Sequence, residues 1–534
     1  MRKLLVVCLL MMAMMVGGIA CSNNTGSQEG GGEGDHEFHQ EGLPIVDEKM
    51  TLKFVSPKAP LAPDYNEMEI IQTLEEITNV HIAWDNIPGD GYEERKNLML
   101  ASNDLPDAFY NAEFSDHEIV KYGQAGTIIP LEELIEEYAP NLQNIFEQRP
   151  EIKSMVTAPD GHIYSLPKAE EMGLSAVPNF TSINKSWLDE LGLETPATLD
   201  ELGDVLRAFR DEDPNGTGKK DVIPFSFMHN HWTGNFGDMF AAFGIPDNVD
   251  HRIILDGKVI FTAIQPEYKE AIAYFHDWVD EGLIDPEAFT HDVSQYFAKG
   301  KTNPPTLGAY IWWETEEIVG PERADDYVLL PPLEGPNGHQ MVGRSNYSEY
   351  DRGAFVITSA NKHPEITMRW VDQLYEPKMS AQISWGPIGI IYEEDENGML
   401  INKELDEGEA MGEIRQKVAP NGPTAVLAEH FGTVVDMEPR AKQRLNDIEE
   451  VYAPYLVEEN YPDIFFTEEE LDRINRLEME ILDFVNQQQA LWLLNGGVEE
   501  EWDSYVNQLE RMGLDELMEI YQEGLDRFNE NLSQ

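Results

Sequence analysis

The residues 213–221 form the sharpest candidate for metal chemistry in this sequence. Oxygen-bearing side chains recur at alternate positions, and Gly218 can take the sharp turn that such a loop needs. The spacing matches a calcium loop with ligands Asp213, Asn215, Thr217, the Lys219 carbonyl and Asp221. Because Pro224 stands where a bidentate Glu is usual, a turn without metal is the alternative. The sequence predicts a structural Ca²⁺ site and no organic cofactor.

Aromatic side chains next to polar or glycine residues form a second candidate site. Sugars present apolar C–H faces together with hydroxyl groups, so their sites pair flat rings with Asn, Asp, Glu and Arg. Core packing is the alternative for each tryptophan singly, but we expect at least two of them to line a cleft. The candidate ligand-binding residues are Trp232, Asn235, Trp312, Trp313, Glu314, Arg344, Tyr347 and Trp385.

Catalytic motifs give little support to an enzyme. The sequence has no GxSxG elbow and no HExxH, and Gln295 occupies the first glycine position of an apparent phosphate loop that ends at Gly300. With 100 acidic residues, a pair of carboxylates suited to glycosidase chemistry would be found by chance. Binding is therefore favoured over catalysis, and a secreted polysaccharide-degrading enzyme is the alternative.

The elements that must position these residues alternate between strand and helix. Strand patterns at 52–56, 81–84 and 107–110 enclose helical patterns at 66–78 and 92–101. Further helices are expected from Thr198 and over 268–279, and further strands at 306–313 and 327–330. This order predicts an α/β protein with a parallel sheet covered on both faces.

The last 70 residues differ from the rest of the chain. A capping box at 467–470 opens a long amphipathic run, which Gly496 and Gly497 interrupt. Two further helices then extend to Asn531. We expect this tail to pack around a lobe rather than to form a separate functional domain.

Composition limits the possible partners. The chain has 534 residues, 37 Lys+Arg and 100 Asp+Glu, which gives a formal charge of −63. This length suits several domains or two large lobes, and a 41% hydrophobic share is enough for sizeable cores. Because such a charge repels phosphate backbones and anionic lipid headgroups, nucleic acid and membrane-surface binding are disfavoured.

The N-terminus has the layout of a secretory leader. Arg2 and Lys3 precede an apolar run of residues 4–16, which is too short to span a bilayer. The sequence GIAC at 18–21 resembles a bacterial lipobox, so we expect a signal peptide over 1–20 and lipidation of Cys21. A Gly-rich and acidic segment follows, and we expect a flexible tether over 21–47.

Two stretches carry a resemblance to a known family. DGHIYSLP at 160–167 resembles the family sequence DGKIYGLP, and INKSWLDELGLETPATLDEL at 183–202 resembles the signature YNKxWLxxLGxxxPxTxxEL. Both are typical of the extracellular solute-binding lipoproteins of bacterial ABC importers. The likeness falls in the large carbohydrate branch, with the alginate-binding and LplA/LipO-type lipoproteins, and runs from about residue 50 to the C-terminus.

The resemblance implies a two-lobed, type II periplasmic-binding-protein-like fold with a hinge and a helical C-terminal extension. Crossings near Pro167, Thr306 and Glu376 would place 48–167 and 306–376 in one lobe, and 168–305 and 377–534 in the other. Tyr110, Trp312, Trp313 and Arg344 would then face Trp232, Asn235 and Trp385 across the cleft. The alginate-binding proteins carry a similar calcium loop, but their ligand Glu is replaced by Val222 here.

The implied function is capture of a carbohydrate, expected to be an oligosaccharide, by hinge closure and delivery to the permease subunits of an ABC transporter. The protein would be a monomer anchored by lipid at the extracellular face of the cell membrane. A peptide-binding lipoprotein is a further alternative.

Overall fold

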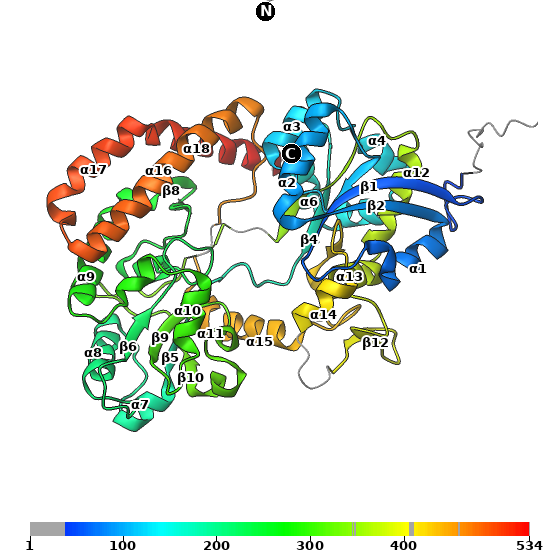
Figure 1. Ribbon diagram of the computed structural model, residues 1–534. Coiled ribbons are helices and arrows are strands. Elements are labelled where there is room, and N and C mark those ends of the chain that lie inside the picture. The colour runs from blue at the N-terminus through cyan, green and yellow to red at the C-terminus, as the bar shows by residue number, and fades with distance from the viewer. Residues whose placement is uncertain (1–37, 344, 347–348, 405–410, 458–459, 533–534) are drawn as a thin grey trace, which may run out of the picture.

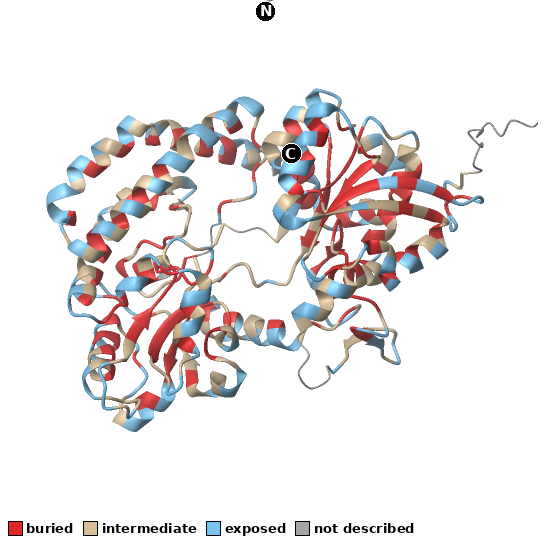
Figure 2. Ribbon diagram, viewed as in Figure 1, coloured by how far each residue is buried: buried red, intermediate tan, exposed pale blue. Residues whose placement is uncertain are grey.

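Two separate sheets divide the chain into two lobes, which lie side by side in Figure 1. The computed structural model describes residues 38–343, 345–346, 349–404, 411–457 and 460–532. Within this part of the chain, no helix has the length and apolar character needed to cross a membrane. Buried residues, red in Figure 2, are concentrated in the sheets and on the helix faces that cover them. Each lobe therefore has its own core.

Lobe 1 is built on a six-stranded sheet in the order β14-β4-β11-β3-β1-β2. Its strands are β1 (Met50–Lys58), β2 (Val80–Pro88), β3 (Ala108–Tyr110), β4 (Leu166–Glu170), β11 (Tyr350–Ile357) and β14 (Ala425–Val426). The three predicted N-terminal strands correspond to β1, β2 and β3, and these run parallel as expected. The sheet is mixed, however, because β11 lies antiparallel between β3 and β4.

The helices of lobe 1 pack on both faces of this sheet. They are α1 (Glu69–Thr78), α2 (Gly89–Ser102), α3 (Asp116–Gln124), α4 (Glu132–Tyr138), α5 (Pro140–Gln148), α6 (Pro150–Val156), α12 (Pro364–Asp372), α13 (Pro377–Trp385) and α14 (Met411–Val418). A small hairpin of β12 (Tyr392–Glu394) and β13 (Leu400–Asn402) adjoins α14. Phe54 contacts Trp370 edge to face at 5.3 Å, which joins β1 to α12 across the core.

Lobe 2 is built on a four-stranded sheet in the order β10-β5-β9-β6. Its strands are β5 (Phe180–Asn184), β6 (Ile223–Ser226), β9 (Leu307–Trp312) and β10 (Tyr327–Leu329), and β7 (Arg252–Leu255) and β8 (Lys258–Phe261) form a separate hairpin. The helices are α7 (Lys185–Leu191), α8 (Leu199–Asp211), α9 (Pro266–Asp280), α10 (Val293–Gly300) and α11 (Thr315–Val319). The predicted helices and strands of this region are all present.

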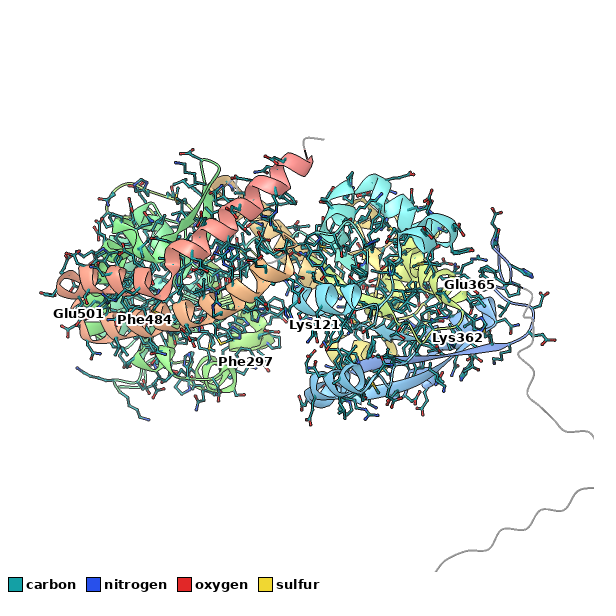
Figure 3. All side chains as sticks on the ribbon, turned by 90° about the horizontal axis from the view of Figure 1, so that it is seen from above. Lys121, Phe297, Lys362, Glu365, Phe484 and Glu501 are labelled. Carbon is teal, nitrogen blue, oxygen red and sulfur yellow. The ribbon has the colours of Figure 1, made fainter. Side chains whose placement is uncertain are left out.

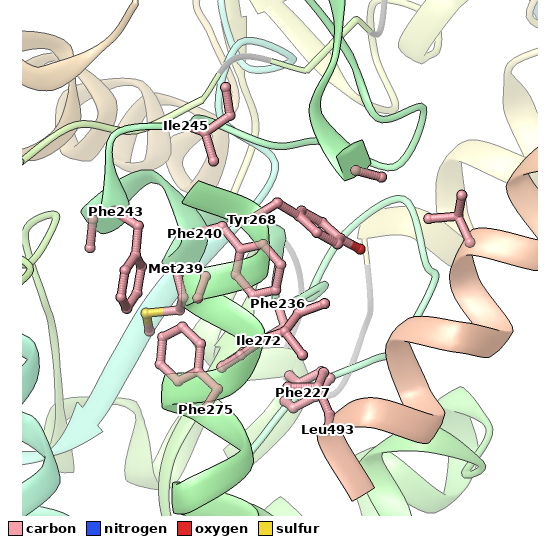
Figure 4. Packing of buried hydrophobic residues seen from close by; sticks show 14 of the residues in the cluster. Phe227, Phe236, Met239, Phe240, Phe243, Ile245, Tyr268, Ile272, Phe275 and Leu493 are labelled. Carbon is pink, nitrogen blue, oxygen red and sulfur yellow. The ribbon is translucent and has the colours of Figure 1, made fainter. Parts of the chain in front are cut away.

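Phenylalanines dominate the core of lobe 2 (Figure 4). Phe236 stacks on Phe227 at 4.6 Å and meets Phe275 of α9 edge to face at 4.5 Å. Each such pair contributes about 0.5–1.5 kcal/mol beyond its buried area. This core fixes the loop that follows β6, which carries Trp232.

The C-terminal helices cover lobe 2 as predicted. They are α16 (Glu468–Asn495), α17 (Val498–Met512) and α18 (Leu514–Leu532), whereas α15 (Pro439–Asp447) precedes them and lies between the lobes in Figure 1. The capping box at Thr467 and Glu470 starts α16, which packs on α9 and buries Trp492. In the view from above, Phe484 and Glu501 lie over lobe 2, and Lys121 of α3 lies at the border between the lobes (Figure 3).

The C-terminal segment also touches lobe 1. Arg352 of β11 is buried and donates to the carboxylate of Asp463, while its guanidinium lies 4.5 Å from the centre of the Phe465 ring. Asp116 at the start of α3 pairs with the same guanidinium at 3.3 Å. Together with contacts between α3 and α16, this cluster joins the lobes away from the chain crossings.

The chain crosses between the lobes at 171–179, at 330–349 and along α15, because Val435 still pairs with Leu400 of lobe 1. The first crossing lies close to the predicted Pro167, but the other two differ from the prediction. Residues after Thr306 form β9, which pairs with β5 and β6 of lobe 2, and α13 beyond Glu376 packs on β14 of lobe 1. These positions depend on long-range strand pairing, which local periodicity does not encode.

The described end of the predicted tether is packed against lobe 1. Ile45 and Val46 are fully buried, and the Arg369 guanidinium donates to the carbonyl oxygens of His39 and Gly42. Burial of two aliphatic side chains stabilises this segment by about 3–5 kcal/mol. Any flexible tether therefore ends before residue 38, and the predicted signal peptide and Cys21 lie outside the described residues.

Candidate functional site

A cavity of about 450 Å³ lies where the lobes and the crossing segments meet, and this volume suits a small organic ligand. We call it the joint cavity. The end of β4 and two crossing segments form one side, and the loop after β6, the end of β9 and α15 form the other. Its lining residues are Lys168, Glu170, Met172, Leu174, Ser175, Val177, Pro178, Phe180, Trp232, Trp313, Glu349, Tyr350, Asp351, Arg444 and Ile448.

Two tryptophans of lobe 2 form the aromatic side of the joint cavity. The ring of Trp232 is 47% exposed, although a side chain of this size is normally covered in a folded protein. Trp313 follows β9, and the two ring centroids lie 6.4 Å apart with their planes inclined by 39°. The two rings therefore offer an apolar surface to a ligand.

Arginines of α15 complete this side. The Arg444 guanidinium lies 4.1 Å from the centre of the Trp313 ring and donates through Nη1 to Glu314 at 3.1 Å. Arg440, four residues earlier on the same helix face, donates to the other carboxylate oxygen at 3.1 Å. Burial raises the pKa of Glu314, and the two arginines offset part of that rise. Glu314 thereby fixes Arg444 against the ring.

Carboxylates and hydroxyl groups form the opposite side. Glu349 accepts a hydrogen bond from the backbone of Leu174 at 3.0 Å, and burial raises the pKa of this carboxyl group. The Tyr350 hydroxyl donates to Glu171 at 2.8 Å. With Lys168 nearby, this side offers both donors and acceptors, so the cavity can hold a ligand that is apolar on one face and rich in hydroxyl groups at its edges.

The structure brings only some of the predicted site residues together. Trp232 and Trp313 line the joint cavity, and Glu314 adjoins it. Both tryptophans belong to lobe 2, rather than to opposite lobes as predicted, because β9 pairs within the sheet of lobe 2. Arg344 and Tyr347 lie outside the described residues.

Four predicted residues lie away from the cavity. Trp312 is buried behind Trp313 and donates to Glu317, and Asn235 is buried and accepts from the backbone of Gly237. Tyr110 is fully buried in lobe 1, and Trp385 packs against Phe431 in the same lobe. Trp312 is the last residue of β9 and is 4% exposed, whereas Trp313 follows the strand and lines the joint cavity.

Sequence reasoning missed Lys168, Glu349 and Arg444. Lys168 lies on β4 and Glu349 lies at the end of the second crossing segment, and neither could be placed beside the cavity before the strands were paired. Arg444 had a weak signal, because Arg440 and Arg444 are spaced to face one side of a helix. Nothing in the local sequence connected that helix to Trp313.

The polar side chains of the predicted calcium loop are joined by hydrogen bonds within the loop. Asp221 accepts hydrogen bonds from the side chains of Asn215 and Thr217 at 3.1 and 3.0 Å, and Asp213 accepts from the backbone of Gly218 at 2.8 Å. The other carboxylate oxygen of Asp213 is shielded from solvent and has no hydrogen-bond partner within the described part of the chain. That atom and the oxygen-rich donor set fit a hard cation such as Ca²⁺.

Some features of the loop are less favourable. Asp211 cannot replace the missing Glu, because its carboxylate pairs with Arg210 at 2.7 Å. In addition, no cluster of three or more His, Cys, Asp or Glu suited to a metal occurs among the described residues. The ligands would therefore be two carboxylates together with amide, hydroxyl and carbonyl oxygen atoms.

Comparison with known proteins gives a consistent result. Residues 58–381 match the sequence profile described as bacterial extracellular solute-binding protein. The chain is 42% identical over 509 residues to the fructooligosaccharide ABC transporter substrate-binding protein FusA of Streptococcus pneumoniae, covering 93% of this chain and 94% of that protein.

Solved structures agree with these matches. FusA in complex with kestose superimposes with a TM-score of 0.82 over 90% of this chain and all of that chain. An EF-hand mutant of FusA in complex with fructo-nystose is also 42% identical. It superimposes with a TM-score of 0.81 over 90% of this chain and all of that chain. A solute-binding protein for HMO from Bifidobacterium longum infantis is 25% identical and gives 0.80, covering 90% of this chain and 99% of that chain.

Proposed function

The chain belongs to the bacterial extracellular solute-binding protein family, and from this premise we propose that it captures fructo-oligosaccharides for an ABC importer. The predicted class is confirmed, because relatives matched over most of the chain are carbohydrate-binding components of ABC transporters and not enzymes. The two-lobed α/β fold is confirmed as well. The choice of fructan rests on 42% identity to a protein that was solved with kestose.

The observation that carries the proposal is the composition of the joint cavity. Trp232 and Trp313 would stack on the C–H faces of sugar rings. Arg444, Lys168 and Glu349 would bond to the hydroxyl groups at the ring edges. Glu314 acts through Arg444 as a positioning residue. We do not propose Tyr110, Asn235, Trp312 or Trp385 as ligand contacts, because they lie away from this cavity.

The mechanism would be ligand-selected closure. Residues of both lobes and the crossing segments line the cavity, so a bound sugar contacts both lobes at once. A ligand shifts the open and closed populations only by its difference in affinity for the two states. The sugar would favour the closed form and then pass unaltered to the permease.

Two finer features belong to the same proposal. Ca²⁺ would bind at Asp213, Asn215, Thr217, Lys219 and Asp221, supported by the unpartnered Asp213 oxygen and by the EF-hand of FusA. The family is extracellular, and the lipobox-like residues 18–21 support a lipid anchor at Cys21. A monomer is sufficient for such a receptor.

Titration calorimetry tests the proposal directly. The protein is titrated with kestose, maltotriose, polygalacturonate and a tripeptide, and kestose is expected to bind most tightly. Chromatography of the same mixtures should show kestose intact after prolonged incubation. Binding of the peptide in place of every sugar would contradict the ligand class, and free fructose would favour the enzyme alternative.

A further inference from the structure

A second cavity, of about 470 Å³, lies in lobe 1 where the parallel strands β1, β2 and β3 end. The carboxyl ends of parallel strands are where open α/β sheets bind ligands. The start of α2 and one side of α14 complete its wall, and both lie on the side of lobe 1 that faces lobe 2 (Figure 1). The side chains that matter here are Asp90, Asn111, Glu113, Arg415, Gln416 and Asn421.

The second cavity adjoins the joint cavity. The turn 111–114 follows β3 and runs beside β11, where the Ala112 amide donates to Ala354 at 2.8 Å and the Phe114 amide donates to Gly353 at 3.3 Å.

Glu113 lines the second cavity, and Asp351 of the same β11 lines the joint cavity. Burial raises the pKa of Glu113, Lys96 opposes this rise, and the carboxylates of Glu93 and Asp351 add to it. The two cavities are therefore lined from neighbouring segments of lobe 1, the turn 111–114 and β11.

The wall of the second cavity is held in place from behind. The Tyr65 hydroxyl donates to the carbonyl oxygens of Pro57 at 2.9 Å and Pro420 at 3.1 Å, and the buried Tyr110 hydroxyl donates to Asn421. Asn111 and Glu113 both have left-handed backbones, with φ of 46° and 50°. Such strain is found where a fold fixes side-chain directions for binding.

The chemistry of the second cavity complements that of the first. Its walls carry two cations, Lys58 and Arg415, and two carboxylates, Asp90 and Glu113, so the local charge is balanced. The Nε of Arg415 is shielded from solvent and has no hydrogen-bond partner within the described ranges. Among the described residues of the lining, Tyr65 is the only aromatic one, and its hydroxyl is already bonded. The cavity therefore suits hydrogen bonding to a neutral, hydroxyl-rich group.

We infer that the second cavity is a polar subsite for one end of the same oligosaccharide, whose rings stack on Trp232 and Trp313 in the joint cavity. This inference rests on the proposed function. Arg415 and Glu113 would form hydrogen bonds with adjacent hydroxyl groups of the terminal sugar unit. A guanidinium donates two hydrogen bonds side by side, and a carboxylate can accept two. Lobe 1 would then supply hydrogen-bonding specificity, and lobe 2 would supply the aromatic surface.

Calorimetry with kestose tests the inference in Glu113→Gln, which keeps the size of the side chain, and in Arg415→Gln, which leaves a shorter, uncharged polar side chain. Each variant is expected to bind kestose about tenfold more weakly, because a hydrogen bond to a charged group is lost. Arg95→Gln and Glu94→Gln remove the same charges from exposed positions on α2 and serve as matched controls with unchanged affinity. Melting of each unliganded variant checks that the fold is retained.

Hydrogen exchange of the wild-type protein gives a second test that needs no substitution. Kestose is expected to slow exchange in residues 111–114 and 415–421 as well as near Trp232. The subsite is wrong if both variants bind kestose as tightly as the wild type does. It is also wrong if kestose leaves the exchange of those two segments unchanged. In either case the proposed function stands, provided that the wild type binds kestose. If the wild-type protein binds none of the sugars, both fail.

Discussion

Trp232 shows at the scale of a single residue how a binding surface differs from a core. Its ring is 47% exposed beside Trp313, whereas Trp312, one residue away from Trp313, is only 4% exposed. An exposed aromatic ring contributes little to folding, because burial of apolar surface is what stabilises the native state. The exposed ring at 232 is therefore better explained by ligand binding than by stability.

We expect Trp232→Ala to weaken kestose binding by roughly 30-fold, or about 2 kcal/mol, as for an aromatic anchor of an interface. The melting temperature without ligand should remain close to that of the wild type. Met479→Ala, at a 70% exposed position on α16, serves as the control. Equal affinity of Trp232→Ala and the wild type in calorimetry would remove the ring from the site.

Glu171 connects three parts of lobe 1 next to the first crossing. Arg149 donates to both of its carboxylate oxygens at 2.8 and 2.9 Å, and the Ala428 amide donates at 2.9 Å. Burial alone would raise the pKa of Glu171, but these bonds and the one from Tyr350 outweigh it and lower the pKa. The carboxylate thus stabilises the fold when it is ionised.

The sign of the pH dependence follows from the lowered pKa. Glu171 contributes stability above its unfolded pKa of about 4.3, and this contribution is lost as the pH falls toward the lower folded value. Glu171→Gln should lower the free energy of unfolding by about 1–2 kcal/mol at pH 7, because a half-buried charged acceptor is lost while Arg149 keeps its ion pair with Glu429. Melting curves should be recorded from pH 7 to pH 3. The difference in melting temperature between Glu171→Gln and the wild type should become smaller as the pH falls. A constant difference would contradict this account, and Glu94→Gln is the control.

At the scale of elements, the loop between α8 and β6 is ordered by its own hydrogen bonds. Asn215 and Thr217 both donate to Asp221, and Asn215 also donates to the carbonyl of Pro305 just before β9. The loop thereby ties two neighbouring strands of lobe 2 together. A cation there would stabilise lobe 2 rather than contact the sugar.

We expect added Ca²⁺ to raise the melting temperature of the wild type by about 3 °C, as binding to the native state alone requires. Asp213→Ala should abolish this rise, because it removes the carboxylate whose second oxygen has no partner in the described residues. Asp211→Ala should keep the rise, since that carboxylate pairs with Arg210. A wild type that is indifferent to Ca²⁺ would leave the loop as a turn without metal.

At the scale of the whole molecule, the lobes are joined in two ways. Three segments cross between the lobes and contribute residues to the walls of the joint cavity, and the buried Arg352 holds the segment that carries Asp463 and Phe465 against lobe 1. Separating a buried charge from its partner is unfavourable in free energy. We therefore expect the contact between Arg352 and Asp463 to persist during closure. The lobes would then move about an axis that passes near both connections.

X-ray scattering should detect this movement. Kestose is expected to lower the radius of gyration of the wild type, because ligand bridging favours the closed form. The double variant Trp232→Ala, Trp313→Ala should remain in its unliganded shape at the same kestose concentration. An identical radius with and without saturating kestose would exclude closure as the mechanism.

The sequence by itself determined part of the helices and strands, the capping box at Thr467, the family and the class of ligand. These features depend on near neighbours, such as the alternation of residues 52–56 or the helical spacing from 66 to 78, and on motifs that are contiguous in the chain. Tertiary structure decided the mixed sheet, the later crossings and the choice between Trp312 and Trp313. It also brought Arg444 to Trp313 and Glu113 to β11. Contacts between segments that are far apart in the chain arise from strand pairing and packing. They cannot be predicted from the spacing of apolar residues within a segment.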